Sequence, residues 1–179
     1  MKALKKICTA LMLLAFAFVF ASCSNDSDDD DQSITLSDGS YTLAITKTSD
    51  GMVEKYDIKA TASNESWTFK SGSKTETVDL TKKMKTDELE EFNKMDENAK
   101  KAEAKKNMEF PDDAEVSFVN NEVIVKTTLS AAELTEMQEN YQLSSIPSDA
   151  KIETITEKTE YEITMSRKDG TIVFHVNKD

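Results

Sequence analysis

The sequence predicts an α+β fold dominated by antiparallel β hairpins, with about eight strands and two helices in the order ββββ-α-ββ-α-ββ. We expect the helices to pack on one side or end of the sheet. Apolar and polar side chains alternate around two turns, Asp50-Gly51 and Asp169-Gly170, which is typical of half-buried hairpins. Two other segments repeat apolar residues at helical spacing. No βαβ pattern, which a parallel sheet needs, is present.

Pairing outward from Asp50-Gly51 predicts the register of the first hairpin. Lys47 meets Glu54 as an opposite-charge pair close to the turn, on the face that also holds the apolar residues. One register satisfies nearly every side chain, as a half-buried hairpin requires. The apolar pairs predicted on this face are Ile45 with Tyr56, Leu43 with Ile58, and Tyr41 with Ala60.

The same reasoning predicts further hairpins. A fourth strand is expected after a turn at residues 71–73, a Ser-Gly-Ser sequence. Residues 151–166 change their apolar alternation after Ile152, which predicts a bend or bulge at 156–159. The pairs predicted are Met165 with Phe174 and Ile163 with Val176 at Asp169-Gly170, and Phe118 with Val123 and Val116 with Val125 at Asn120-Asn121.

Two helices are expected between the strands. The first begins with Thr86 as its cap and places acidic residues early and lysines late, which suits the helix dipole. The second begins with a capping box formed by Ser130 and Glu133. Its apolar residues Leu134, Met137 and Tyr141 should face the core.

The acidic composition disfavours two classes of partner. The chain has 22 basic and 34 acidic residues. Removing residues 1–22 would take away three lysines, leaving 19 against 34, or a formal charge of −15. Nucleic acids and anionic lipid headgroups both attract basic surfaces, so we expect neither as a partner of the folded domain. Residues 33–179 are enough for one domain with its own core.

The N-terminal residues have the pattern of an export signal. Three lysines precede an apolar run, Ile7 to Ala21, that is too short to span a membrane as a helix. The sequence Phe20-Ala21-Ser22-Cys23 resembles the lipobox of bacterial lipoproteins, with Phe20 where that family more often has Leu. The resemblance implies a signal peptide of residues 1–22 and acyl chains such as palmitate on Cys23. Three such chains would contribute on the order of 30 kcal/mol of membrane binding. The alternative is an ordinary secretory signal with a chance cysteine.

Residues 23–32 form an acidic stretch that cannot bury apolar surface and repels itself, so we expect an extended tether. An EF-hand loop starting at Asp26 would need Gly and Glu where the chain has Asp31 and Ser37. The stretch instead resembles the export signal of Bacteroidota surface lipoproteins, which implies the outer membrane and the cell exterior; a periplasm-facing anchor is the alternative. The residues concerned are Ser27, Asp28, Asp29, Asp30 and Asp31.

No catalytic centre, metal site or cofactor is predicted, so we expect a protein that is not an enzyme. Beyond the lipid site at Cys23 the domain has no cysteine, and its one histidine, His175, cannot make a usual zinc site. His175 should lie on the face opposite Phe174 and Val176. A carboxylate pair that hydrolyses glycosides is the enzymatic alternative, and it would need one carboxyl with a pKa raised by apolar surroundings.

Two functional hypotheses follow. The first is a membrane-anchored domain that binds a glycan or a protein outside the cell, without catalysis. Trp67 and Phe69, which share a strand face, would stack on a ligand if that face were exposed, and would otherwise belong to the core. The second is a structural, inhibitor or immunity-type envelope protein that acts by occupying a protein partner. The sequence sets neither the ligand nor the oligomeric state.

Overall fold

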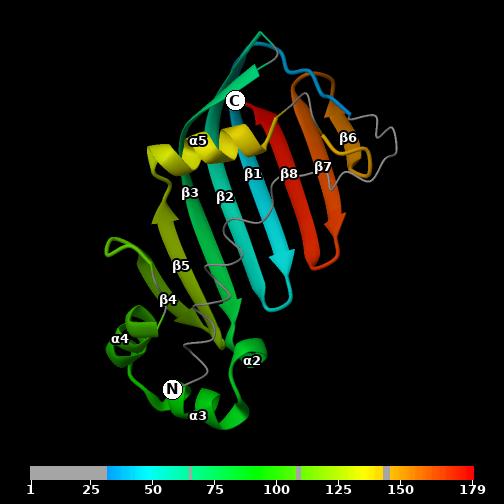
Figure 1. Cartoon of the computed structure of the whole chain (residues 1–179). Helices are drawn as coiled ribbons and strands as arrows, with labels where there is room; N and C mark the ends of the chain where they lie inside the picture. Colours follow the sequence, from blue (N-terminus) through cyan, green and yellow to red (C-terminus); the bar gives the residue numbers. More distant parts are fainter. Residues whose placement is uncertain (1–31, 65, 108–109, 143–145) are drawn as a thin grey trace.

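A computed structural model describes residues 32–64, 66–107, 110–142 and 146–179. They form one eight-stranded antiparallel sheet in the order β4-β5-β3-β2-β1-β8-β7-β6 (Figure 1). The predicted α+β class is therefore confirmed. The strands are β1 (Gly39–Ser49), β2 (Met52–Ser63), β3 (Ser66–Asp79), β4 (Glu115–Val119), β5 (Glu122–Thr128), β6 (Lys151–Thr156), β7 (Glu160–Arg167) and β8 (Gly170–Lys178).

Two hairpins have the predicted register. In the β1–β2 hairpin the predicted pairs all occur, and Lys47 lies opposite Glu54. In the β4–β5 hairpin the loop residues Asn120 and Asn121 adopt φ values of 46° and 66°, as a two-residue turn of this kind requires. Both registers follow from the turn residues, because a two-residue loop leaves the strands only one way to pair.

The expected turn at residues 71–73 does not exist, because β3 runs through it as one long strand. β3 pairs with β2 along one edge and with β5 along the other. Gly72 leaves room for the chain that enters the helix after β5: a Cβ on Gly72 would lie 2.9 Å from Cδ1 of Leu129. The chain therefore has three strands, not four, before its first helix.

A β-bulge explains why the sequence of β3 resembled two strands. The register against β2 shifts between Lys59 and Ala60, which leaves Lys70 of β3 without a partner. The extra residue reverses the alternation of side chains along β3. The core-facing residues after it are Lys74, Glu76 and Val78.

The C-terminal hairpin has the predicted core face but a register two residues away from the predicted one. Its loop consists of Lys168 and Asp169, and Gly170 belongs to β8. A Cβ on Gly170 would lie 1.8 Å from the carbonyl oxygen of Thr48, so the glycine serves the close approach of β1 and not the turn. The observed pairs are Met165 with Ile172 and Ile163 with Phe174.

Residues 151–166 divide into β6 and β7 at the expected bend. Thr159 N donates to Thr156 O at 3.1 Å, and Lys158 adopts a φ of 60°. The pairing of β6 with β7 is irregular between Thr154 and Thr156. Five of the six residues of β6 are exposed, so this edge strand extends past the core.

The expected first helix is divided into α3 (Thr86–Lys94) and α4 (Glu97–Asn107), and a further short helix that was not expected, α2 (Leu80–Lys83), precedes it. Thr86 is the first residue of α3 and not its cap. The break before α4 arises because Asp96 Oδ1 accepts a hydrogen bond from Ala99 N at 2.8 Å and so caps a new helix. The last helix, α5 (Ala131–Asn140), begins with the predicted capping box of Ser130 and Glu133.

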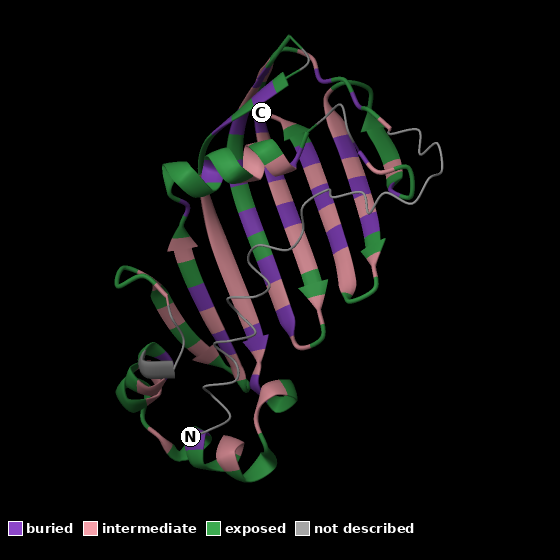
Figure 2. Ribbon diagram, viewed as in Figure 1, coloured by how far each residue is buried: buried purple, intermediate pink, exposed green. Residues whose placement is uncertain are grey.

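Two apolar clusters lie on the same face of the sheet. α5 crosses this face and covers the larger cluster, while α2, α3 and α4 gather at one end over the smaller one (Figures 1 and 2). The larger cluster includes Leu134 of α5 and Tyr141, the residue that follows this helix, as predicted. Figure 2 shows buried residues alternating with more exposed ones along the central strands, which leaves the opposite face to solvent. Among the described residues, no helix has the length and apolarity to cross a bilayer.

Candidate functional site

Five polar side chains meet on the core face of the sheet, between the two apolar clusters. They come from three adjacent strands: Lys47 from β1, Glu54 and Tyr56 from β2, and Lys74 and Glu76 from β3. The strand register sets them side by side, because Glu54 lies opposite both Lys47 and Glu76, and Tyr56 lies opposite Lys74. We call this group the polar cluster.

Glu54 is the centre of the polar cluster. It is 4% exposed and is the one buried charged residue in the described part of the chain. Its Oε1 lies 3.1 Å from Lys74 Nζ, and its Oε2 lies 3.9 Å from Lys47 Nζ. Tyr56 donates its hydroxyl to Oε2 at 3.3 Å. Lys74 also pairs with Glu76, so two ammonium groups and two carboxylates balance in charge.

The surroundings shift the proton affinity of the cluster's side chains. Burial raises the pKa of Glu76, and the hydrogen-bonded Glu54 adds to this while Lys74 opposes it. Burial alone would lower the pKa of Lys74, but the two carboxylates raise it above its ordinary value. Burial lowers the pKa of Lys47, whose ammonium is farther from Glu54. Of the two lysines, Lys47 therefore holds its proton less firmly.

Aromatic rings complete the surroundings of Lys47. Its Nζ lies 4.9 Å from the ring centre of Tyr56 and 5.9 Å from that of Tyr141. The faces of these rings are electron-rich and attract a cation. Burial, together with the charge of Glu54, raises the pKa of both tyrosines, so both hydroxyls keep their protons at neutral pH. α5 and the sheet thus contribute jointly to the site.

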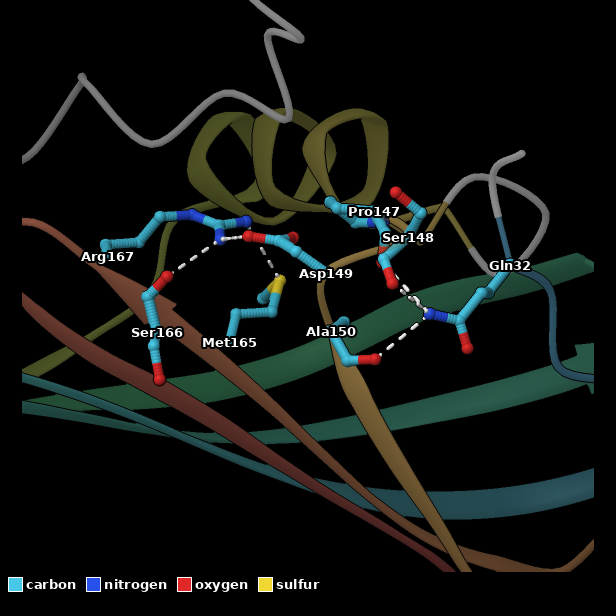
Figure 3. Close-up of polar contacts among 8 residues, drawn as sticks. All are labelled: Gln32, Pro147, Ser148, Asp149, Ala150, Met165, Ser166 and Arg167. Atoms are coloured by element: carbon cyan, nitrogen blue, oxygen red, sulfur yellow. Dashed lines mark hydrogen bonds and ion pairs between the residues drawn. The ribbon is translucent and has the colours of Figure 1, made fainter. Parts of the chain in front are cut away.

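A hollow adjoins the polar cluster near the turns of the β1–β2 and β7–β8 hairpins. Its lining includes Lys47, Glu54 and Arg167, and its volume of about 20 Å³ is room for a water molecule. Figure 3 shows the Arg167 guanidinium directed at Asp149, with Nη1 2.9 Å from Oδ2. Arg167 is therefore held at the rim of the hollow, where its side chain is 28% exposed.

This arrangement suits binding better than catalysis. Glu54 and Glu76 both pair with the Lys74 ammonium, which occupies the space between the two carboxylates that a glycosidic bond would need. Among the described residues, no group of three or more His, Cys, Asp or Glu could hold a metal ion. Neighbouring ammonium, carboxylate and hydroxyl groups offer both donors and acceptors to a polar ligand.

Trp67 and Phe69 lie in the larger apolar cluster, at 8% and 7% exposure. Their ring centres are 5.2 Å apart, and Trp67 Nε1 donates to the carbonyl oxygen of Tyr141 at 2.9 Å. A small apolar cavity of about 20 Å³ beside Trp67 has room for a water molecule and not for a sugar ring. The exposed face that ligand stacking would need is not present at these two rings.

The other sequence-predicted residues lie apart from the polar cluster. His175 is on the opposite face of the sheet, as expected, with Nε2 3.3 Å from Oε1 of Glu160. The lipid-attachment and export residues lie outside the described residues: Cys23, Ser27, Asp28, Asp29, Asp30 and Asp31.

The sequence predicts three of the five residues of the polar cluster. Lys47, Glu54 and Tyr56 were predicted on the core face, but Lys74 and Glu76 were not assigned to it. The bulge at Lys70 hid them, because it moves the even-numbered residues of β3 to the core side. No protein family, curated protein or solved structure matches the chain. The case for function therefore depends on the residues themselves.

Proposed function

We propose that this protein is a lipoprotein anchored through Cys23 to the outer membrane, facing the cell exterior, whose domain binds a ligand without catalysis. Three features of the sequence support this proposal. The apolar N-terminal run and the lipobox-like residues before Cys23 support the lipid anchor, and the acidic run after Cys23 supports the exterior location. A lipid anchor of this kind holds a domain at the membrane without any membrane-binding surface.

The polar cluster and its adjoining hollow are the proposed binding site. With a volume of about 20 Å³, the hollow admits a single hydroxyl or other polar group of a ligand at the Arg167 rim and not a whole sugar ring. Burying charged groups costs several kcal/mol, and apolar residues in their place are often as stable or more so. A carboxylate at 4% exposure, on a sheet face whose other buried residues are apolar, is the observation on which this proposal depends. Positions that depart in this way from the most stable choice of residue concentrate at functional sites.

The ligand class proposed is a glycan or a polar protein loop. Each sugar hydroxyl donates and accepts a hydrogen bond at once, which matches ammonium and carboxylate groups placed side by side. Arg167, at the rim, is the residue that a ligand would meet first. It lies near the surface, so replacing it should leave the fold intact.

A binding experiment tests the site. The soluble chain from Ser24 would be applied to an array of neutral and acidic oligosaccharides, and hits would be measured by calorimetry. Arg167→Gln should weaken binding at least tenfold, or about 1.4 kcal/mol, with an unchanged melting temperature. The matched control is Lys55→Gln, an exposed cation on the opposite face of the sheet. Equal affinity of the Arg167 variant and the control would contradict the proposed site.

A protease experiment tests whether the domain faces the cell exterior. Protease added to intact cells should remove the wild-type domain. A variant with residues 28–31 changed to alanine should keep the anchor but become protected, since the domain would stay inside. Protection of the wild type would contradict the exterior location.

A second candidate function, occupation of a protein partner, is favoured by the sheet edges. Val119 on β4 and Ile155 on β6 are the exposed large apolar residues in the described part of the chain, at 48% and 49%. Both edge strands present backbone groups that could pair with another chain. A protein recovered with the wild-type domain, but not with a Val119→Lys variant, would support this function over ligand binding at the polar cluster.

A further inference from the structure

We infer that the end of the domain formed by residues 146–150 and β6 faces the membrane. The inference rests on the proposed anchor at Cys23 and begins with the point where the tether meets the domain. At that point Gln32 and Ile146 exchange two backbone hydrogen bonds, of 2.7 and 2.8 Å. Gln32, the last residue of the expected tether, therefore already lies against the domain.

The side chain of Gln32 fastens this contact. Its Nε2 donates to the carbonyl oxygens of Ser148 at 2.9 Å, Ala150 at 3.0 Å and Pro147 at 3.3 Å (Figure 3). The same loop is fixed to β7, because Asp149 pairs with Arg167. Gln32 is thus attached to a loop that is itself attached to the sheet. We call these contacts of Gln32 the clamp.

The residues that follow Gln32 are held along the β6–β7 end of the sheet. Ile34 and Leu36 are buried in the larger apolar cluster, at 8% and 4% exposure. Thr35 accepts a hydrogen bond at its carbonyl from the hydroxyl of Tyr161, at 3.0 Å. These contacts keep residues 32–36 in place, so the free part of the tether stops at Gln32.

Tether length then limits how the domain can turn. Gln32 comes nine residues after Cys23, and that stretch spans at most about 30 Å when fully extended. A domain of this length has a radius of gyration of about 15 Å, so it is about 40 Å across. A chain free as far as β1 would reach about 55 Å and would let any side approach the bilayer. The clamp makes the tether shorter than the domain is wide.

The composition of the clamped end is compatible with a lipid surface. Residues 146–156 contain one lysine against one aspartate and one glutamate, or a formal charge of −1, and the aspartate is paired with Arg167, whereas the whole chain carries −12. Ile155 presents an exposed apolar side chain there. α3 lies at the opposite corner of the molecule (Figure 1), so it would point away from the bilayer.

Nuclear magnetic resonance on nanodiscs tests this orientation. The mature chain from Cys23 has one thiol, which would be coupled to a maleimide lipid in nanodiscs that also contain a gadolinium-chelating lipid. Amide signals of β6 should broaden several-fold more than those of α3. Equal broadening of the two elements, or stronger broadening of α3, would overturn the inference.

Two variants show whether the clamp is the cause. Gln32→Ala should reduce the difference in broadening between β6 and α3. Gln142→Ala, which removes an exposed glutamine amide elsewhere, should leave the difference unchanged, and equal effects of the two variants would refute the role of Gln32. Because the coupling is chemical, the result does not depend on native acylation. An unmodified Cys23 in the native protein, found by mass spectrometry, would remove the proposed anchor and leave the nanodisc result standing.

Discussion

Replacing Lys74 by methionine should strongly destabilise the domain. The Lys74 ammonium contacts Glu54 at 3.1 Å and also pairs with Glu76, and the side chain is 15% exposed. Methionine keeps most of the apolar stem and removes the charge. The two carboxylates would then share Lys47, 3.9 Å from Glu54, as their cation. Removing one partner of a buried ion pair costs about 3–5 kcal/mol, out of a total of about 5–15 kcal/mol for a domain.

The loss of stability in the Lys74→Met variant should depend on pH. Burial already raises the pKa of Glu76 in the folded protein, and removing Lys74 takes away the group that opposes this rise. A folded-state pKa above the unfolded value gives stability that is full below the unfolded pKa, about 4.3 for Glu, and is lost as pH rises through the folded value. The Lys74→Met variant should therefore come close to the wild type in acid and fall behind as the pH rises to neutral.

Urea unfolding, followed by the fluorescence of Trp67 between pH 4.5 and 8, measures this loss. Lys55→Met, an exposed lysine on the opposite face, should stay within about 0.5 kcal/mol of the wild type. The double variant Lys74→Met/Glu76→Leu should recover most of the loss, because Glu54 keeps Lys47. The reasoning is refuted if the single variant loses less than about 1 kcal/mol at neutral pH, or loses as much in acid.

Other predictions concern the sheet and α5. Burial and the charge of Glu54 raise the pKa of Tyr56 and Tyr141. Their stabilising effect is therefore full below about pH 10 and is lost above it, so that a tyrosinate absorbance signal should appear together with unfolding; tyrosinate formed in a protein that keeps its native circular dichroism would contradict this. Gly170→Ala should cost about 3 kcal/mol or more, because a Cβ there meets Thr48 O at 1.8 Å; a melting temperature equal to that of the wild type would contradict the close approach. Ser130→Ala should lower the free energy of unfolding by about 1 kcal/mol through loss of the α5 cap, and denaturant titration checks it.

The sequence predicts those parts of the fold that local chemistry decides. The β1–β2 and β4–β5 registers follow from two-residue turns, and the start of α5 follows from Ser130 and Glu133. The predicted register of the C-terminal hairpin was wrong because Gly170 is required by its contact with β1, a strand far away in the chain. Its Asp-Gly sequence resembles a turn, and only the pairing of β8 with β1 shows why glycine is needed there.

The same distinction between local and distant contacts explains which residues of the polar cluster could be predicted. Lys47 and Glu54 were predicted as a pair because they flank one short turn. Lys74 and Glu76 join them only after the bulge has reversed the alternation of β3, and the glycine beside that bulge, Gly72, was interpreted as part of a turn. The break between α3 and α4 was missed for a related reason, since Asp96 fits both a helix interior and a cap.

The pairing of β1 with β8 has a consequence for how the chain reaches its native state. Residues 41–49 bond to residues 170–178, so β1 has only β2 beside it until a segment more than a hundred residues later adds its second neighbour. Contacts so distant in sequence slow folding. A chain threaded through a translocon from its N-terminus would therefore complete its central sheet only after almost the whole chain had passed.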